Sequence, residues 1–246
     1  MRVVALGATR GMGRALSRLM AERGDLLFLL GRNPKELDRA SRDLEIRAGS
    51  GLRFGSAHCD LEQPDGFSAA LDQAAATLGG FDCVIVSAGV FAPQTELEEN
   101  PEVARRMLEV NFTRTVEFCE HVRRRLLAAG GGRLCVFSSV AGERGRKPVV
   151  LYGAAKAGLS CYLEGLDHKF RHLGLVTVCV KPGFVKTGMT AGLEPPPFAG
   201  EPEPVARRVL RAIDRGTPVV YVPGIWRWIM LVIRHLPRFL MRRLGF

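Results

Sequence analysis

Short runs of apolar residues alternate along the chain with longer stretches in which apolar residues recur every three or four positions. The short runs have the length of strands, and the run at 82–89 is dominated by apolar residues, as expected for a strand buried on both faces. The expected strands are 3–6, 26–30, 52–60, 82–89, 133–139, 175–183 and 218–223. The expected helices are about 13–23, 34–48, 64–78, 101–129 with Asn100 as N-cap, and 150–173.

This alternation is typical of βαβ units and predicts an α/β fold built on a doubly wound parallel sheet of about seven strands. A chain of 246 residues can form one such domain. We expect the domain to cover 1–223 and a separate helical tail to cover 224–246.

One segment breaks the alternation. Residues 188–204 contain five prolines and three glycines, which exclude a long regular element. A loop that follows the carboxyl end of a strand lies where α/β proteins bind ligands. We therefore expect a mobile lid over a substrate, with an inert surface loop as the alternative.

The distribution of charge changes the picture at the carboxyl end. The net charge is +10, and no acid follows Asp214, whereas six arginines do. A basic and apolar end suggests contact with an anionic surface.

No basic-then-apolar leader is visible at the amino end, so we expect a cytoplasmic protein. The six cysteines form no C-x-x-C pair, so we expect free thiols and no metal site.

The tail itself has a short apolar stretch, Trp228 to Ile233, which is much too short to span a bilayer. Pro237 should divide the tail into two short helices. Tryptophan, apolar residues and arginine together suit helices that lie in the headgroup layer, on the inner face of a membrane. The arginines expected near one helical face are Arg227, Arg234, Arg238 and Arg242. The alternative is a tail that packs on the core or on a sister subunit of a homo-oligomer. We expect no nucleic-acid partner, because no recognised binding module accompanies these arginines.

A glycine-rich turn lies between the first expected strand and the first expected helix. Glycines there let the backbone approach a pyrophosphate, and the free N–H groups at the start of the helix favour phosphate. The spacing is G-x-x-x-G-x-G, one residue longer than the commoner G-x-G-x-x-G. The candidate cofactor-binding residues of the turn are Gly7, Thr9, Arg10, Gly11, Met12 and Gly13.

The end of the second strand bears on which dinucleotide binds. An acid at this place would favour NAD, but the chain has Gly31 followed by Arg32. Arg32 and Arg10 together suit the 2′-phosphate of NADP, because arginine binds phosphate oxygens in a fork. We therefore expect NADP, with NAD as the alternative. After the third strand, Asp60 and Leu61 could contact the adenine, and Ala88 and Gly89 after the fourth could line the cofactor floor.

Four further residues are candidates for catalysis. Tyr152 and Lys156 are spaced i, i+4 and so share one helical face, where the ammonium should favour the phenolate and lower the pKa of the tyrosine. Ser139 ends the fifth strand and could polarise a substrate carbonyl, while strand alternation turns Ser138 away. Asn111 is an unfavoured residue in a helix interior, which a bridge from backbone to a water chain at Lys156 would explain.

With these pieces in this order, the chain over about 1–222 resembles the short-chain dehydrogenase/reductase family, whose fold is Rossmann-type. The resemblance implies hydride transfer between a nicotinamide and a carbonyl or alcohol, with Tyr152 as acid or base. It also implies that Lys156 and Tyr152 contact the nicotinamide ribose. The positions that it assigns to the carboxamide are Pro182, Gly183, Val185 and Thr187. Leu6 and Ser87 depart from the family, where many members have threonine and asparagine.

The tail and Ala141-Gly142-Glu143-Arg144 are similar to a subgroup that includes the decaprenylphosphoryl-2-keto-pentose reductases. That resemblance implies a lipid-linked keto substrate and a separate flavin oxidase that produces it. Two other functions stay open. One is a soluble 3-oxoacyl or general carbonyl reductase, and the other is a regulator that binds NADP without turnover.

Overall fold

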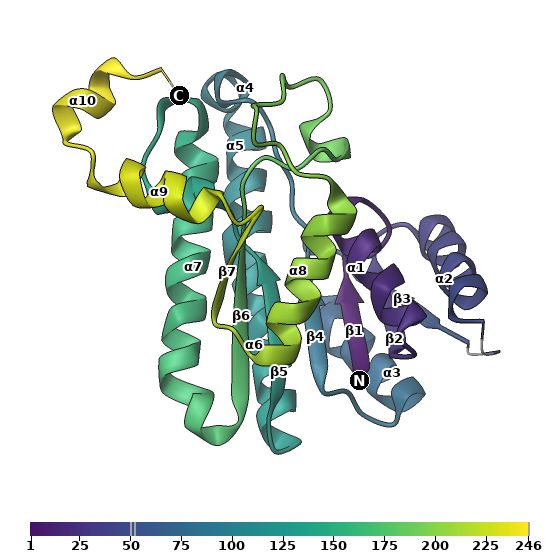
Figure 1. Ribbon diagram of the computed structural model, residues 1–246. Helices are drawn as coiled ribbons and strands as arrows, with labels where there is room; N and C mark the ends of the chain where they lie inside the picture. The colour runs from purple at the N-terminus through teal and green to yellow at the C-terminus, as the bar shows by residue number, and fades with distance from the viewer. Residues whose placement is uncertain (50, 52, 246) are drawn as a thin grey trace.

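Seven parallel strands form one sheet in the order β3-β2-β1-β4-β5-β6-β7 (Figure 1). The computed structural model describes residues 1–49, 51 and 53–245. The strands are Arg2–Leu6 (β1), Leu26–Gly31 (β2), Gly55–His58 (β3), Cys83–Val86 (β4), Gly132–Phe137 (β5), Leu175–Pro182 (β6) and Val219–Val222 (β7). The strand order reverses between β1 and β4, and ligands of such sheets bind in the crevice at that point. The expected doubly wound sheet is confirmed.

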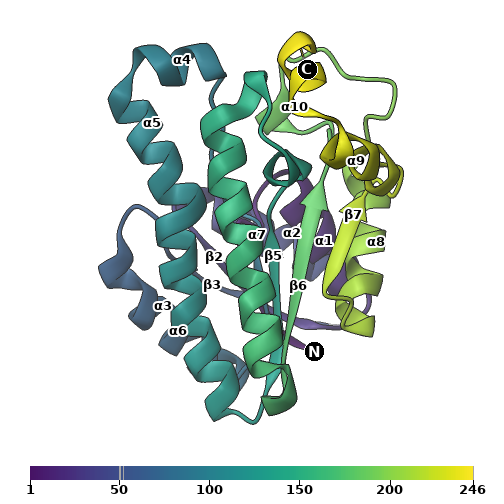
Figure 2. The same cartoon turned by 90° about the vertical axis from the view of Figure 1, so that its left-hand side faces the viewer.

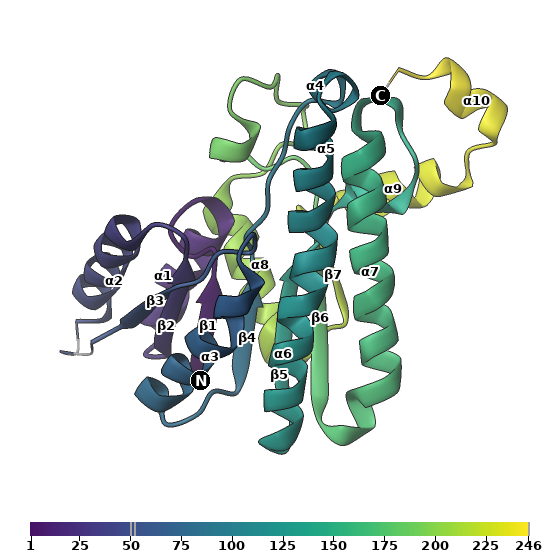
Figure 3. The same ribbon diagram turned by 180° about the vertical axis from the view of Figure 1, so that it is seen from behind.

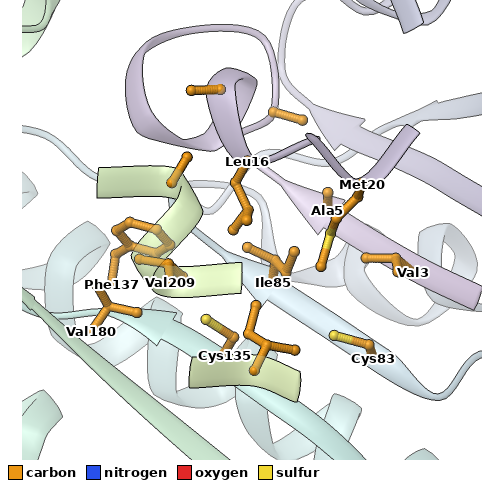
Figure 4. Close-up of a cluster of buried hydrophobic side chains, with 14 of the residues drawn as sticks. Val3, Ala5, Leu16, Met20, Cys83, Ile85, Cys135, Phe137, Val180 and Val209 are labelled. Carbon is orange, nitrogen blue, oxygen red and sulfur yellow. The ribbon is translucent and has the colours of Figure 1, made fainter. Parts of the chain in front are cut away.

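Both faces of the sheet are buried, which explains why its strands are continuous apolar runs. Side chains alternate across β1, so Val3 and Ala5 enter one core while Val4 and Leu6 enter the other. In Figure 4, Leu16 of the first helix lies in the former core with Val3 and Ala5.

Helices cover the two faces in sets of three. One face carries Gly11–Glu22 (α1), Pro34–Ala48 (α2) and Pro202–Arg215 (α8). The other carries Phe67–Leu78 (α3), Arg114–Ala128 (α6) and Val150–Phe170 (α7), which stand in front of the sheet in Figure 3. The carboxyl ends of the strands therefore open into a crevice bordered by the start of α1 and the start of α7.

The region predicted as one helix over 101–129 is more complex. It consists of Pro101–Leu108 (α5), a π-helical turn at Glu109–Thr113 and α6. Asn100 caps α5 as predicted, because its side chain accepts from the amides of Glu102 and Val103. The short helix Gln94–Glu99 (α4) precedes it and was not predicted.

Two other boundaries differ from prediction. The helix α8 was missed because the proline-rich loop was extended to 204, although Pro202 begins the helix, where its missing N–H is harmless. The strand expected at 52–60 covers only β3, and Leu52 lies outside the described residues. Single 3-10 turns occupy Pro64–Gly66, Val140–Glu143, Lys147–Val149, Arg171–Leu173 and Gly188–Thr190.

The tail forms two short helices, Trp226–His235 (α9) and Arg238–Arg243 (α10), separated at Pro237 as predicted. Figure 2 shows α9 beside the carboxyl end of β7, with α10 above it. Phe246 lies outside the described residues. Within the part of the chain that the structure describes, no helix has both the length and the apolarity to cross a membrane.

Candidate active site

Glycines at three positions give the turn after β1 its close-packed backbone. Gly7 and Gly11 have φ angles of 94° and 53°, which side chains disfavour. A Cβ on Gly7 would lie 2.5 Å from the amide nitrogen of Ala88, and one on Gly13 would collide with the carbonyl oxygen of Gly7. The first turn of α1 contains no acid that would repel phosphate. The backbone thus fits the phosphates of a dinucleotide.

Ser87 fixes the shape of this turn. Its hydroxyl lies 3.1 Å from the carbonyl oxygen of Gly7 and 3.3 Å from that of Leu6, and it can donate to either. The serine therefore ties the end of β4 to the phosphate turn. It stands where the family resemblance leads one to expect asparagine, and its hydrogen-bonding side chain was the signal available in the sequence.

The π-helical turn explains the unusual place of Asn111. The extra residue in the turn breaks the regular helical hydrogen bonds, and Thr115 donates to the freed carbonyl of Val110 at 2.7 Å. The Asn111 amide accepts from the backbone N–H of Val90 at 3.1 Å and donates to its carbonyl at 2.8 Å. Asn111 is buried beside Gly89, where a Cβ would lie 2.8 Å from its oxygen and 3.8 Å from the Lys156 ammonium.

Ser139 and Tyr152 meet because the turn Val140–Glu143 packs directly on α7. A Cβ on Gly142 would lie 2.6 Å from the backbone of α7, and one on Gly153 would lie 2.9 Å from the carbonyl oxygen of Ala141. Ser139 Oγ accepts from the amide of Ala141 at 3.1 Å and lies close enough to the Tyr152 hydroxyl to lower its pKa. The expected pair of hydroxyls is therefore present at the end of β5.

Ser138 lies on the other side of β5. Its hydroxyl donates to the carbonyl oxygen of Lys156 at 2.9 Å, and its Oγ lies 2.7 Å from the Oγ of Ser160. It thus fixes α7 against the strand and leaves Ser139 as the serine beside the phenol.

Burial controls the proton affinities of Tyr152 and Lys156. It raises the pKa of Tyr152 to about 12, with the hydrogen bond from Ser139 acting in the opposite direction. It lowers the pKa of Lys156 to about 8. The Lys156 ammonium donates to the carbonyl oxygen of Phe137 at 3.0 Å and lies 5.8 Å from the centre of the Tyr152 ring. The expectation that this ammonium lowers the pKa of the phenol is therefore wrong, because burial raises that pKa and the opposing effect comes from Ser139.

The two arginines expected at the adenosine end do not share a site. Arg10 is ion-paired with Glu36, and Arg32 lies 3.6 Å from Glu62. A cavity of about 260 Å³ beside the phosphate turn is lined by Thr9, Arg10, Arg14, Arg18, Glu36, Arg39, Ala40 and Asp43. Sequence reasoning missed Arg39 because it lies on α2, away from any motif.

Asp60 and Leu61 follow β3 as expected. Asp60 Oδ1 accepts from the amide of Glu62 at 3.1 Å, so the carboxylate also shapes its own turn. Leu61 is buried in the core on the α3 side. The structure therefore keeps this pair at the carboxyl end of the sheet, next to β2.

The segment after β6 comes back to the phosphate turn. A Cβ on Gly11 would lie 3.4 Å from the methyl group of Thr187. Pro182 accepts a hydrogen bond from Ser139 Oγ at 3.4 Å, and Val185 pairs with Gly200 across the base of the proline-rich loop. One short stretch thus borders both the phosphate turn and the catalytic serine.

Trp226 is a residue of this site that sequence reasoning missed. A Cβ on Gly183 would collide with its indole ring, so the ring lies against Gly183. The ring also packs with Met230 and with Val140, and Val140 directly follows Ser139 in the sequence. The first turn of the tail therefore borders the site. Only its aromatic character was visible in the sequence, and that suggested a membrane surface.

Comparison with known proteins agrees with this geometry. The sequence model described as short chain dehydrogenase matches residues 2–197. An uncharacterised oxidoreductase of Mycobacterium tuberculosis is 31% identical over 242 residues, which cover 98% of this chain and 96% of that protein. A 3-oxoacyl-(acyl-carrier-protein) reductase of Chlamydia muridarum is 29% identical over 190 residues, covering 77% of this chain and 76% of that protein.

A solved structure shows the same fold. The short chain dehydrogenase of Mycobacterium paratuberculosis bound to NAD superposes with a TM-score of 0.80, at 24% identity, over 90% of this chain and 96% of that one. At this identity the likeness concerns the fold alone.

The low pKa of Lys156 predicts a pH-dependent stability. Unfolding restores a lysine pKa near ~10.4, so between about pH 8 and 10 the unfolded chain holds a proton that the folded chain has released. The free energy of unfolding should therefore rise with pH in that window. In Lys156→Met the cost of burying the charge is absent, so the variant should gain on the order of 3 kcal/mol at pH 7, and this gain should shrink as the pH approaches 10.

Urea denaturation of the cofactor-free proteins measures this difference. Lys169→Met, an exposed lysine of the same helix, is the control and should show no such trend. A stability difference for Lys156→Met that stays constant with pH would contradict the prediction.

Proposed function

The chain belongs to the short-chain dehydrogenase family and is an oxidoreductase that uses a nicotinamide cofactor, and from that premise we propose that it reduces a ketone with Tyr152 as proton donor. The observation that carries the proposal is the position of the Ser139 hydroxyl next to the Tyr152 phenol, beside the buried ammonium of Lys156. The reduced nicotinamide would supply the hydride.

The side chains then divide the remaining work. Ser139 donates a hydrogen bond to the ketone oxygen, and Tyr152 gives that oxygen its proton as negative charge develops. A phenol with a pKa of about 12 stays protonated at neutral pH, which suits the direction of reduction. Lys156 holds positive charge close to the site, and Asn111 fixes the backbone of Val90 on the opposite side.

Residues of several elements would hold the cofactor. We assign the phosphates to the turn Gly7 to Gly13, the adenosine end to Arg10, Asp60 and Leu61, and the nicotinamide end to Ala88 and Gly89. The segment from Pro182 to Thr187, with Gly183 and Val185, would complete that end. Because Arg10, Arg14 and Arg39 line one cavity, we propose NADP as the preferred dinucleotide.

We assign a second role to the tail, residues 224–246, which we treat as separate from the catalytic unit 1–223. One face of α9 packs on the core through Met230 and Ile233. The other face exposes 61% of Trp228 and 63% of Val232, and α10 exposes 60% of Phe239. An apolar face of this kind beside arginines suits a lipid surface.

The basic side of this surface differs from the predicted ridge. Arg234 forms an ion pair with Glu143. The break at Pro237 separates α9 from α10, so the arginines do not follow one helical face. Instead, Arg227 of α9 lines a groove of about 860 Å³ together with Arg208, Arg211 and Arg215 of α8. Anionic headgroups complement these arginines, although Glu164 and Asp167 of α7 also line the groove. We therefore propose a lipid or lipid-linked ketone as substrate and the inner face of a membrane as the site of action.

The relative from Chlamydia muridarum favours a second candidate function, a soluble 3-oxoacyl reductase. In that case α9 would serve only as a packing element or as a contact between subunits. The exposed face of the tail decides between the two, because a soluble reductase would not need it.

Tyr152→Phe tests the reaction. Loss of the phenolic proton should lower kcat for ketone reduction roughly 10²–10⁴-fold and leave NADPH binding unchanged. The assay is NADPH consumption with keto-lipids, oxoacyl thioesters and keto-sugars. Tyr162→Phe, on the same helix but hydrogen-bonded to Glu120, is the matched control. Undiminished turnover in Tyr152→Phe, or NADPH binding without any turnover in the native chain, would refute the proposal.

Arg39→Ala tests the preference for NADP. Loss of a charged hydrogen bond to the 2′-phosphate should raise KM for NADPH about 10–100-fold and leave KM for NADH nearly unchanged. Arg42→Ala changes an exposed arginine of the same helix that does not line the cavity and should have little effect. Equal losses with both cofactors would show that Arg39 does not distinguish them.

The lipid surface is tested by replacing Trp228, Val232 and Phe239 with serine. The native chain should sediment with phosphatidylglycerol vesicles, less with phosphatidylcholine vesicles, and the triple variant with neither. Activity on a water-soluble ketone should survive. A control variant replaces three exposed apolar residues elsewhere, Ile46, Leu173 and Phe198. Vesicle binding that is unchanged in the tail variant would exclude this role of the tail.

A further inference from the structure

The chain between the two catalytic hydroxyls is unusually basic. It runs from Ser139 to Tyr152 and contains Arg144, Arg146 and Lys147 but only one acid, Glu143. Every residue of this segment is therefore within a few positions of a side chain assigned to proton transfer.

Most of these charges already have partners. Glu143 is buried and forms ion pairs with Lys181 of β6 and, at 3.2 Å, with Arg234 of α9. Arg144 donates to the carbonyl oxygen of Leu236 at 2.9 Å, and Lys147 donates to that of Arg242 at 2.7 Å. The tail thus holds the segment on both sides of Arg146.

Arg146 differs from its neighbours. Among the residues that the structure describes, it has no ion-pair partner, and its Nε atom is buried without a hydrogen bond. Burial lowers the pKa of its guanidinium, and no carboxylate opposes this effect. The side chain as a whole is half-buried, and a buried donor atom without a partner is costly, so its retention in a fixed segment needs an explanation.

The position of Arg146 suggests that explanation. It immediately precedes the turn Lys147–Val149, which leads into α7 with Tyr152 in its first helical turn. The turn and the first turn of α7 shorten the backbone path between Arg146 and Tyr152, so a long side chain and a small substrate can bridge the two residues.

We propose that Arg146 binds an oxyanion of the substrate, a phosphate or a carboxylate, while the ketone lies against Ser139 and Tyr152. The guanidinium presents a planar fork of N–H donors that matches two oxygens of such a group. The proposal depends on the proposed ketone reduction, and it requires the ketone substrate to carry a negatively charged group.

Anion binding to the cofactor-loaded protein tests this assignment without turnover. Saturating NADP⁺ occupies the nucleotide phosphate sites, and inorganic phosphate or acetate is then added while Tm is recorded. We expect one or both anions to raise Tm of the native chain and of Tyr152→Phe, to act weakly on Arg146→Lys, and to have no effect on Arg146→Met. The anion whose effect depends on Arg146 identifies the group as phosphate or carboxylate.

Arg146→Met also has an expected effect without any anion. Replacing this half-buried, unpartnered cation by an apolar side chain of similar length should raise Tm by about 2–4 °C. Arg124→Met, an exposed arginine on α6, is the control and should change neither Tm nor the anion response. The assignment is overturned if neither anion stabilises the native chain, if Arg146→Met responds like the native chain, or if Arg146→Met lowers Tm without anion.

Because Tyr152→Phe is included, a failure of this assignment is distinguishable from a failure of the proposed reaction. An anion effect that depends on Arg146 in a chain that reduces no ketone would leave the binding site standing and remove the reaction. Turnover of neutral ketones without such an anion effect would leave the reaction standing and remove the binding site.

Discussion

The burial of one ammonium group is the constraint around which the crevice is arranged. Lys156 is surrounded by protein, and the hydrogen bond to the Phe137 carbonyl replaces only part of its lost hydration. A charge in that position is tolerated where the backbone around it is fixed. Ser138 fixes the Lys156 carbonyl, and Asn111 fixes the strand-end segment at Val90. The π-helical turn and the close approach at Gly89 then follow, since a regular helix or a side chain at 89 would displace the Asn111 amide.

The same burial explains why the cofactor-free site favours proton donation. A phenol beside an ammonium is expected to ionise more easily. That argument holds only if both groups stay hydrated, so that burial has no effect on their pKa values. Here both groups are removed from water, so each is shifted toward its neutral form. The neutral form of Tyr152 is the proton donor, which fits reduction, and the charge of Lys156 is retained only up to about pH 8.

The sequence predicted well those features that recur with a period or occupy a turn. The strands, the glycine turn, the Asn100 cap and the break at Pro237 all depend on local chemistry, so they could be recognised locally. Four features could not be predicted from the sequence. The start of α8 at Pro202 was obscured by neighbouring prolines, and Arg39 approaches the phosphate turn only because α2 packs beside α1. Trp226 reaches Gly183 from a distant segment, and the proton affinities depend on burial, which no spacing reveals.

Trp226 belongs to a group of segments that share a location near the catalytic serine. The parts of the chain that border the space beyond Ser139 and Tyr152 are the basic segment before α7, the proline-rich loop after β6 and the tail, and none of them belongs to the regular alternation of strands and helices. Glu143 links the first of these to the third through Arg234. The Glu143 carboxylate is buried, and it is shared between Lys181 of β6 and the partly exposed Arg234 of α9. The tail is thus linked through Glu143 to the segment that follows Ser139, whichever surface the outer face of the tail contacts.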